Sequence, residues 1–228
     1  MDASAALGAA REALAHGVIA VDIPGRSFGG TPVLGPIRFR VRPGETVAIL
    51  GPSGIGKSTL LRIAAGIDRI AEGRAERPGR MAMVMQEPTL LPWRSAIDNL
   101  TVVHPALTPH EAMAMLERVG LGAVPHHFPG QLSLGQQRRL SLARAFAGRP
   151  EALVMDEPFA SLDPETASRM MALTERLIAD ARPATLLVTH SAGEAARLAD
   201  RVLRLSGRPA TISDAPEIAP AAASGSGI

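Results

Sequence analysis

One glycine-rich segment has the residue types and spacing of a loop that holds phosphate groups. It reads Gly51-Pro52-Ser53-Gly54-Ile55-Gly56-Lys57-Ser58-Thr59 and matches the pattern G-x-x-x-x-G-K-[ST] in full. A strand is expected before it and a helix after it, so that backbone N–H groups and a helix N-terminus face an anion. Lys57 is expected to reach the β- and γ-phosphates, and the Ser58 hydroxyl to bind Mg²⁺. The alternative interpretation is a glycine-rich turn without a ligand.

Composition singles out the lysine of this loop. The chain has 24 Lys and Arg residues, and Lys57 is the only lysine among them. Arginine is therefore used wherever else the chain carries a cation of this kind. A compact ammonium on a flexible stem differs from a planar guanidinium fork, so position 57 requires a property that arginine does not offer. This observation favours the phosphate loop over the empty turn.

A second segment supplies carboxylates. Ala152-Leu153-Val154-Met155 reads as an apolar strand, and Asp156 and Glu157 follow at its end. With a phosphate loop upstream, these are the two halves of a phosphoryl-transfer site. Asp156 is expected to hold Mg²⁺ directly or through water, and Glu157 to act as the general base on the attacking water, a role worth roughly 10²–10⁴ in rate. Taken alone, the pair could instead be acidic residues favoured by a helix dipole.

At this point the chain resembles the ABC ATPase family, over about 18–213 and with the family's motifs in their usual order. Leu132-Ser133-Leu134-Gly135-Gln136 resembles the signature motif, and Ser161-Leu162-Asp163 resembles the D-loop. Gln86 resembles the glutamine of the Q-loop, and His190 the switch histidine. Phe28 stands where the family stacks an aromatic side chain on adenine, although the family more often has Tyr there and plain packing is the alternative.

The resemblance implies an enzyme that binds ATP with Mg²⁺ and hydrolyses it to drive transport across a membrane. It also implies a head-to-tail homodimer in which the signature segment and D-loop complete the ATP site of the other copy, through Ser133, Gly135, Gln136 and Asp163. Gln86 would serve Mg²⁺ and water, and His190 would donate to the γ-phosphate. The implied partners are transmembrane permease subunits and, through them, an extracytoplasmic solute-binding protein. The implied location is the cytoplasmic face of the inner (plasma) membrane.

The chain departs from the family pattern at two positions. Leu134 stands where the family usually has glycine, which tolerates positive φ and close backbone approach as leucine does not. If Leu134 has a negative φ and its side chain turns away, the site can work; otherwise dimer closure is weakened. Ser191, after His190, replaces a more usual acidic residue, and little follows from that change.

The segment that follows Gln86 resembles one group of importer ATPases. The segment reads Gln86-Glu87-Pro88-Thr89-Leu90-Leu91-Pro92-Trp93-Arg94 and is followed by Asp98-Asn99-Leu100. It is similar to the corresponding segment of the ATPases that serve nitrate, sulfonate and taurine importers. In this family the surface after the Q-loop receives a helix of the permease. Trp93, the only tryptophan, with Leu90 and Leu91, would form an apolar contact patch there, or would lie in the core of the helical subdomain.

The expected fold is an α/β, P-loop NTPase fold: a mostly parallel sheet with an antiparallel β subdomain and an inserted helical subdomain. Apolar strands alternate with helices, as in parallel sheets, and the exposed-type alternation of Ile37–Val41 indicates an antiparallel strand. Residues 18–213 form the ABC ATPase domain, with the helical subdomain at about 87–149. Residues 1–17 form an N-terminal extension and 214–228 a disordered tail rich in Ala, Pro, Ser and Gly.

Composition excludes several other classes. The chain contains no Cys, so disulfides and thiolate metal sites are excluded. No apolar run approaches the ~20 residues of a membrane span, and no signal peptide is evident. The pI of 10.2 reflects a net charge of only +2 in a chain without Tyr or Cys, so no nucleic-acid partner is expected. His126 and His127, in a proline-flanked loop, are interpreted as surface residues, not as a metal site.

The leading alternative is a regulatory or non-transport ABC ATPase with impaired dimer closure. Leu134 is the only support for a regulatory role, whereas Lys57, Asp156 and Glu157 are all in place. An ABC protein that acts on DNA or ribosomes usually carries a coiled-coil insertion or tandem ATPase halves, and 228 residues show neither. A P-loop kinase or GTPase does not explain the signature segment.

Overall fold

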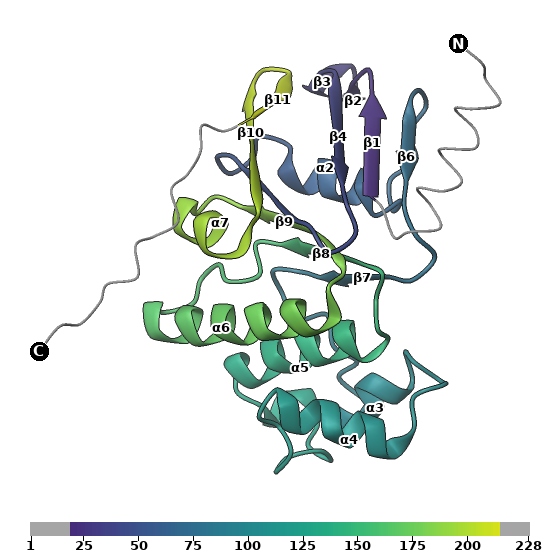
Figure 1. The fold of residues 1–228 in the computed structure, drawn as a ribbon, viewed down its shortest axis with the longest axis vertical. Helices are drawn as coiled ribbons and strands as arrows, with labels where there is room; N and C mark the ends of the chain where they lie inside the picture. Colours follow the sequence, from purple (N-terminus) through teal and green to yellow (C-terminus); the bar gives the residue numbers. More distant parts are fainter. Residues whose placement is uncertain (1–18, 215–228) are drawn as a thin grey trace, which may run out of the picture.

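The structure is a computed structural model that describes residues 19–214 (Figure 1). The predicted extension at 1–17 and the predicted tail beyond Asp214 lie outside the described residues, and Asp214 itself ends a strand. The strands are β1 (Ile19–Ile23), β2 (Arg26–Phe28), β3 (Thr31–Leu34), β4 (Ile37–Val41), β5 (Thr46–Leu50), β6 (Arg74–Glu76), β7 (Met81–Val84), β8 (Ala152–Asp156), β9 (Ala184–Thr189), β10 (Arg201–Gly207) and β11 (Ala210–Asp214). The helices are α2 (Lys57–Ala64), α3 (Ala96–Thr101), α4 (Pro109–Arg118), the 3₁₀ turn η1 (Pro129–Gln131), α5 (Leu134–Ala147), α6 (Pro164–Ala181) and α7 (Ala192–Leu198).

The main sheet has the strand order β2-β3-β11-β10-β5-β9-β8-β7. Its strands from β10 to β7 are mutually parallel, and the other end is completed by antiparallel pairing of β10 with β11 and of β2 with β3. Every residue of β5, β8 and β9 is buried, as the continuous apolar runs in the sequence predict for central parallel strands.

A second, smaller sheet has the order β4-β1-β6 and is antiparallel throughout. Strand β4 alternates between buried and exposed residues, which confirms the predicted orientation of Ile37–Val41. Helix α2 contacts both sheets, and the apolar side chains between them form one continuous core with it (Figure 1). The helix that follows the phosphate loop is therefore held on both sides.

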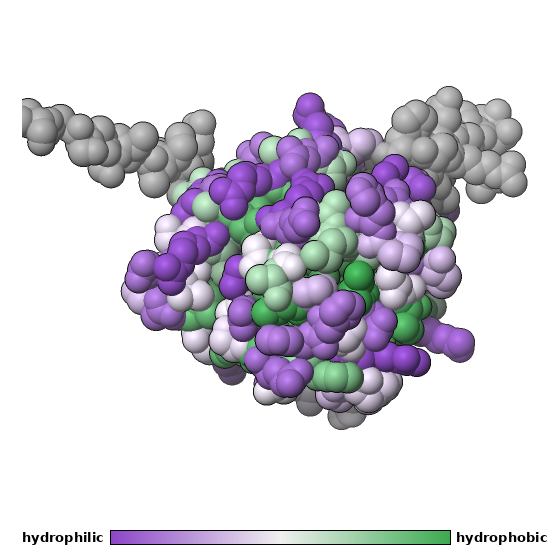
Figure 2. All heavy atoms as spheres, turned by 90° about the horizontal axis from the view of Figure 1, so that it is seen from below, coloured by the Kyte–Doolittle hydropathy of each residue, from purple (hydrophilic) through white to green (hydrophobic). Residues whose placement is uncertain are grey.

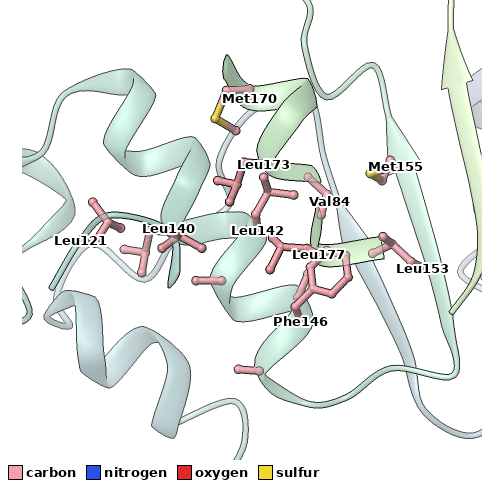
Figure 3. Packing of buried hydrophobic residues seen from close by; sticks show 14 of the residues in the cluster. Val84, Leu121, Leu140, Leu142, Phe146, Leu153, Met155, Met170, Leu173 and Leu177 are labelled. Carbon is pink, nitrogen blue, oxygen red and sulfur yellow. The ribbon is translucent and has the colours of Figure 1, made fainter. Parts of the chain in front are cut away.

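The opposite face of the main sheet carries α5 and α6, with α3 and α4 beyond them at the lower end of the molecule (Figure 1). Figure 3 shows how this second core is filled: Leu142 and Phe146 of α5 face Leu173 and Leu177 of α6, beside Leu153 of β8. Burying side chains of this size contributes about 1.5–3 kcal/mol each. The packing fixes α5, which carries the signature segment, against the strand that ends in Asp156.

Most predicted elements are present, and the differences lie in short strands. The helix predicted after the phosphate loop is α2, which ends at Ala64 with Gly66 at φ 71° just beyond it. Helix α4 begins with a capping box formed by Thr108 and Glu111, with Pro109 at the first turn. The region 24–36, which is rich in Gly and Pro, contains the short strands β2 and β3. No helix within residues 19–214 has the length and apolar character needed to cross a bilayer.

Candidate functional site

The predicted phosphate-handling residues meet at one edge of the main sheet because the strands before them are parallel. Leu50 of β5 pairs with Thr189 of β9, and Val188 of β9 pairs with Asp156 of β8. The phosphate loop, the two carboxylates and His190 all lie at or directly after these strand ends. Ligands of open parallel sheets bind at this carboxyl edge.

The phosphate loop relies on glycines where the backbone requires them. Gly54 and Gly56 have φ values of 74° and 111°, which side-chain-bearing residues rarely adopt. A Cβ on Gly56 would lie 2.8 Å from Leu34 Cδ2, so the end of the loop is packed directly against β3. Pro52, Ser53 and Gly54 are exposed, Gly51 is buried, and Thr59 is half-buried in the first turn of α2.

Helix α2 begins without a side-chain cap. Its N-cap is Gly56, no side chain accepts from its first amides, and its first turn contains no acidic residue. The other α-helices of residues 19–214 all have a capping side chain: Ser95, Thr108, Ser133, Asp163 and Ser191. Uncapped amides at a helix N-terminus favour an anion, so the N-terminus of α2 is suited to a phosphate group.

Lys57 points back over the loop. Its Nζ donates to Pro52 O at 3.0 Å and forms an ion pair with Glu157 Oε1, also at 3.0 Å. The Lys57 side chain is only 4% exposed and that of Glu157 is 16% exposed. A buried ammonium needs such partners, because an unpaired charge in this environment is strongly destabilising.

Glu157 is the meeting point of the site. Its Oε2 lies 3.0 Å from His190 Nδ1, while its Oε1 accepts from Lys57. The residue has φ 44°, and its N–H donates to Val188 O at 2.9 Å, which fixes the carboxylate at the strand end. Burial acts to raise the pKa of Glu157, but hydrogen bonds and charge from Lys57 and His190 together outweigh it and lower that pKa. The carboxylate is therefore ionised and able to accept a proton.

Asp156 has an unsatisfied buried oxygen. Its Oδ1 is buried and has no hydrogen-bond partner among the described residues. Burial raises the pKa of Asp156, an effect that a hydrogen bond with Ser58 opposes. An orphaned carboxylate oxygen beside a serine hydroxyl is a suitable donor pair for Mg²⁺, which typically takes one or two protein oxygens and completes its shell with phosphate and water.

Gln86 lies at the same edge of the sheet, outside the cluster of contacts around Glu157. Val84, the last residue of β7, pairs with Met155, so the chain leaves the sheet beside Asp156. Gln86 follows two residues later, and it is exposed. The predicted site residues of one copy thus fall into a contacting set around Glu157 and a neighbouring glutamine.

The signature segment lies at the start of α5 and is self-capped. Ser133 Oγ accepts from Gln136 N at 3.3 Å, and Gln136 Oε1 accepts from Ser133 N at 2.8 Å. The amides of residues 134 and 135 are not engaged by this capping box. Leu134 has a negative φ as the first helical residue, and its side chain is 52% exposed. The backbone conformation that leucine requires at this position is therefore present.

The signature segment faces a cavity of about 960 Å³ shared with the predicted D-loop. Ser133, Leu134 and Gly135 line one side, and Ser161, Leu162 and Asp163 line another. Asp163 caps α6 by accepting a hydrogen bond from Thr166 N at 2.9 Å. This hydrogen bond is the main cause that lowers the pKa of Asp163. None of the phosphate-loop residues lines this cavity, so one copy of the chain does not bring the two halves of the predicted ATP site together.

Phe28 lies in β2, a strand that the sequence analysis missed. Its side chain is 46% exposed, which disfavours the interpretation as buried packing. The Arg26 guanidinium lies over the ring, 5.0 Å from its centroid. The hairpin partner β3 contacts Gly56, so the aromatic side chain belongs to an element that packs on the phosphate loop.

Trp93 is 68% exposed, so the interpretation as subdomain core is wrong. Phe128 is also exposed. The backbone oxygen of its neighbour, His127, accepts a hydrogen bond from Ala96 N, so the segment that contains Phe128 is joined to the start of α3, just after Trp93. The end of the molecule that carries α3 and α4, called here the helical end, shows a mixture of apolar and polar side chains when it is seen from below (Figure 2).

His126 and His127 are exposed, and residues 19–214 contain no group of three or more potential His, Cys, Asp or Glu metal ligands.

Two positioning residues were not identified from sequence. Asn99 is fully buried; its Oδ1 accepts from Leu91 N, and its Nδ2 donates to three backbone oxygens between Leu91 and Ser95. It therefore shapes the segment that presents Trp93. Arg138 of α5 donates to Ala160 O at 2.8 Å, in the loop just after Glu157. In the sequence, the sign of such a role is a polar residue, Asn99 or Arg138, on the otherwise apolar face of its helix.

Comparisons with known proteins agree on the family. The family described as ABC transporter matches residues 34–160. The aliphatic sulfonates import ATP-binding protein of Pseudomonas fluorescens is 47% identical over 182 residues, covering 79% of this chain and 70% of that protein. A protein of the same description from Rhodococcus jostii is 43% identical over 191 residues, covering 80% of this chain and 76% of that protein.

A solved structure supports the same assignment. An ATP-binding cassette, described as a dimer in a post-hydrolysis state bound to ADP and Pi, superposes with a TM-score of 0.73 at 26% identity. The match covers 86% of this chain and 96% of that one. The fold prediction of a mostly parallel P-loop sheet with an antiparallel sheet and inserted helices is confirmed. The chain belongs to the ABC transporter family, as one of its ATP-binding, ATP-hydrolysing subunits.

Proposed function

We propose that this ATPase works as a head-to-tail homodimer that powers a membrane permease for aliphatic sulfonates. The observation that carries the proposal is the arrangement around Glu157: an ionised carboxylate held between Lys57 and His190, next to an uncapped helix N-terminus. This arrangement has the parts that ATP hydrolysis needs, namely a phosphate cradle, a base and a donor to the γ-phosphate.

Within the site, the loop amides, Lys57 and the Ser58 backbone bind the phosphates. Ser58 and Asp156 hold Mg²⁺, with Gln86 reaching it directly or through water, and the unsatisfied Asp156 Oδ1 supports this assignment. When bound, Mg²⁺ neutralises charge on the β- and γ-phosphates. Glu157 takes the proton of the attacking water, and His190 donates to the γ-phosphate. Phe28 stacks on the adenine ring with its exposed face.

The second copy completes each ATP site. The cavity lined by Ser133, Gly135 and Asp163 contains no phosphate-loop residue of the same chain, so its amides and hydroxyl are available to a nucleotide held elsewhere. On binding, the γ-phosphate would replace Gln136 as a partner of the Ser133 N–H. The dimeric cassette bound to ADP and Pi, which resembles this chain, supports such pairing.

The permease and the cargo are inferred from the surface and from the relatives. Exposed Trp93, on a segment rigidly held by Asn99, fits an apolar contact with a transmembrane subunit. The chain would then sit peripherally on the cytoplasmic side of the inner membrane, with a solute-binding protein acting through the permease. The relatives that match over about four-fifths of the chain are aliphatic sulfonate import proteins, which supports this cargo class over nitrate or taurine.

Uptake into membrane vesicles tests the cargo. Vesicles from source cells that lack this chain are loaded with ATP and the purified chain, and labelled ethanesulfonate is added with its binding protein outside. Uptake that requires the wild-type chain, fails with Glu157→Gln, and is not competed by nitrate is the expected result. Uptake of nitrate instead would reject the sulfonate assignment. The alternative function, a regulatory ATPase with impaired closure, predicts that no cargo moves although ATP binds.

A further inference from the structure

The hairpin of β2 and β3 is built onto the phosphate loop. The register shifts between Arg26 and Ser27, so that Arg26 pairs with Leu34 while Ser27 pairs with Pro32, and Val33 is bulged. The bulge directs Val33 and Leu34 at Gly56: a Cβ built there would meet Val33 Cγ1 at 3.1 Å and Leu34 Cδ2 at 2.8 Å. The position of β2 is therefore fixed relative to the site where the phosphates bind.

Arg26 and Phe28 stand on the same face of β2, because alternate residues of a strand share a face. The Arg26 guanidinium lies over the Phe28 ring, 5.0 Å from the centroid, within the distance of a cation–π contact. Arg26 Nε is buried and has no hydrogen-bond partner within residues 19–214. Among residues 19–214, no carboxylate or carbonyl accepts from Nε, and the contact that the guanidinium does make is with the aromatic ring.

We infer that Arg26 is a positioning residue for the nucleobase: it covers one face of the Phe28 ring and holds the other face toward adenine. This inference rests on the proposed stacking of adenine on Phe28. Phe28 is 46% exposed, so surface remains for a base after Arg26 has taken one face. The contact shown for Arg26 is with the Phe28 ring. If Arg26 acts through that ring, its effect on ATP binding is confined to the base.

Two physical effects would favour binding. The guanidinium removes rotational freedom from an exposed ring before the nucleotide arrives, so less side-chain entropy is lost on stacking. The negative potential on a ring face repels an electron-rich purine. A cation on one face of the ring reduces the negative potential of the other face, and this reduction favours stacking of the purine there. Phenylalanine lacks the hydroxyl by which a tyrosine could be oriented, so an external clamp is of particular use here.

Binding measurements with two ligands separate the base from the phosphates. The full chain is titrated calorimetrically with a non-hydrolysable ATP analogue and with inorganic tripolyphosphate, in wild type, Phe28→Ala, Arg26→Met, Arg26→Lys and the Arg26→Met/Phe28→Ala double variant. Arg38→Met is the control, since Arg38 is an exposed arginine paired with Asp22 on the other sheet. Arg26→Met is expected to weaken the ATP analogue about threefold to tenfold and leave tripolyphosphate unchanged. Arg26→Lys should recover part of the loss.

The double variant decides between the possible outcomes. Arg26→Met should add nothing once Phe28 is alanine, because Arg26 acts through that ring. An equal loss in both backgrounds, an equal loss for tripolyphosphate, or a gain in ATP affinity on removing Arg26 would each overturn the inference. If Phe28→Ala itself leaves the affinity for the ATP analogue unchanged, the proposed adenine stacking fails, and the role of Arg26 fails with it. The thermal midpoint of each variant checks that the fold persists.

Discussion

Lys57 Nζ lies 3.0 Å from Glu157 Oε1, so the single lysine of the chain is paired with the proposed base. The same carboxylate also holds His190 through its second oxygen. If Lys57 binds the γ-phosphate as proposed, that phosphate would compete with Glu157 for Lys57, and the loss of the ion pair would free one carboxylate oxygen to accept a proton from water. The proposed function therefore predicts that nucleotide binding and activation of the base are coupled through this contact.

Lys57→Arg is expected to lower ATP turnover by about 100-fold or more, the scale of losing one positioned donor. The Lys57 side chain is only 4% exposed and sits between Pro52 O and Glu157, so a wider, planar guanidinium has no room to form both contacts. Steady-state phosphate release measures the effect. An arginine outside the site changed to lysine, Arg69→Lys, serves as the control for a change in cation type. Turnover within about threefold of wild type in Lys57→Arg would refute the size argument.

The Lys57–Glu157 pair should also make stability depend on pH. The pKa of Glu157 is lowered in the fold, so its ionised form stabilises the protein above the unfolded value near 4.5, and the contribution disappears as pH falls through the folded value. Glu157→Gln should therefore reduce the free energy of unfolding of the nucleotide-free protein by about 1–3 kcal/mol at pH 7, and by much less at a pH below the folded pKa of Glu157. Denaturant titrations of both proteins at the two pH values measure this difference.

Glu165→Gln is the matched control for that experiment. Glu165 pairs with Arg169 at a solvated helix position, where both side chains are more than two-thirds exposed. Such a surface pair contributes little, so its removal should change stability by under about 0.5 kcal/mol at either pH. A pH-independent difference between wild type and Glu157→Gln would show that the carboxylate is not the source of the stabilisation.

Leu134→Gly tests the departure in the signature segment. Leu134 already has a negative φ, so glycine is not needed there for backbone reasons, and the leucine lines the shared cavity. In a Glu157→Gln background, ATP should convert monomer to dimer, and adding Leu134→Gly should change the dimer affinity by less than about tenfold. Gel filtration with light scattering at several concentrations gives the affinities. A dimer that forms with ATP only after Leu134→Gly would favour the regulatory function.

The sequence predicted the central strands of the main sheet more completely than the edges of the fold. The strands before Gly51, Glu157 and His190 are fully buried, and their unbroken apolar runs made both their existence and their parallel pairing predictable. Strands β2, β3, β6 and β11 were missed because they are short and their burial is partial. Their residues include Pro and Asp, which local patterns assign to turns, and only pairing with distant segments makes them strands.

The contacts within the site show a similar division. The phosphate-loop motif fixed the backbone shape through Gly54 and Gly56, at φ values that residues with side chains rarely adopt. The ion pair between Lys57 and Glu157 could not be predicted, because it depends on how β5 and β8 flank β9 and on the unusual φ of Glu157. Arg26 was likewise invisible, since its partner is a ring two residues away on a strand that the sequence did not indicate.

Trp93→Ala and Asn99→Ala should separate contact with the permease from the folding of its docking surface. Trp93 is 68% exposed, so its removal should leave the thermal midpoint and ATP binding unchanged but reduce transport at least about tenfold, as for an exposed aromatic hot spot. Asn99→Ala removes the partner of buried and partly buried backbone groups between Leu91 and Ser95. It should therefore lower transport and also lower stability, by up to about 1–3 kcal/mol per unsatisfied group. Calorimetric unfolding and vesicle uptake, measured on the same preparations, distinguish the two. Full transport by Trp93→Ala would move the permease contact away from this segment, to the other exposed apolar residues of the helical end.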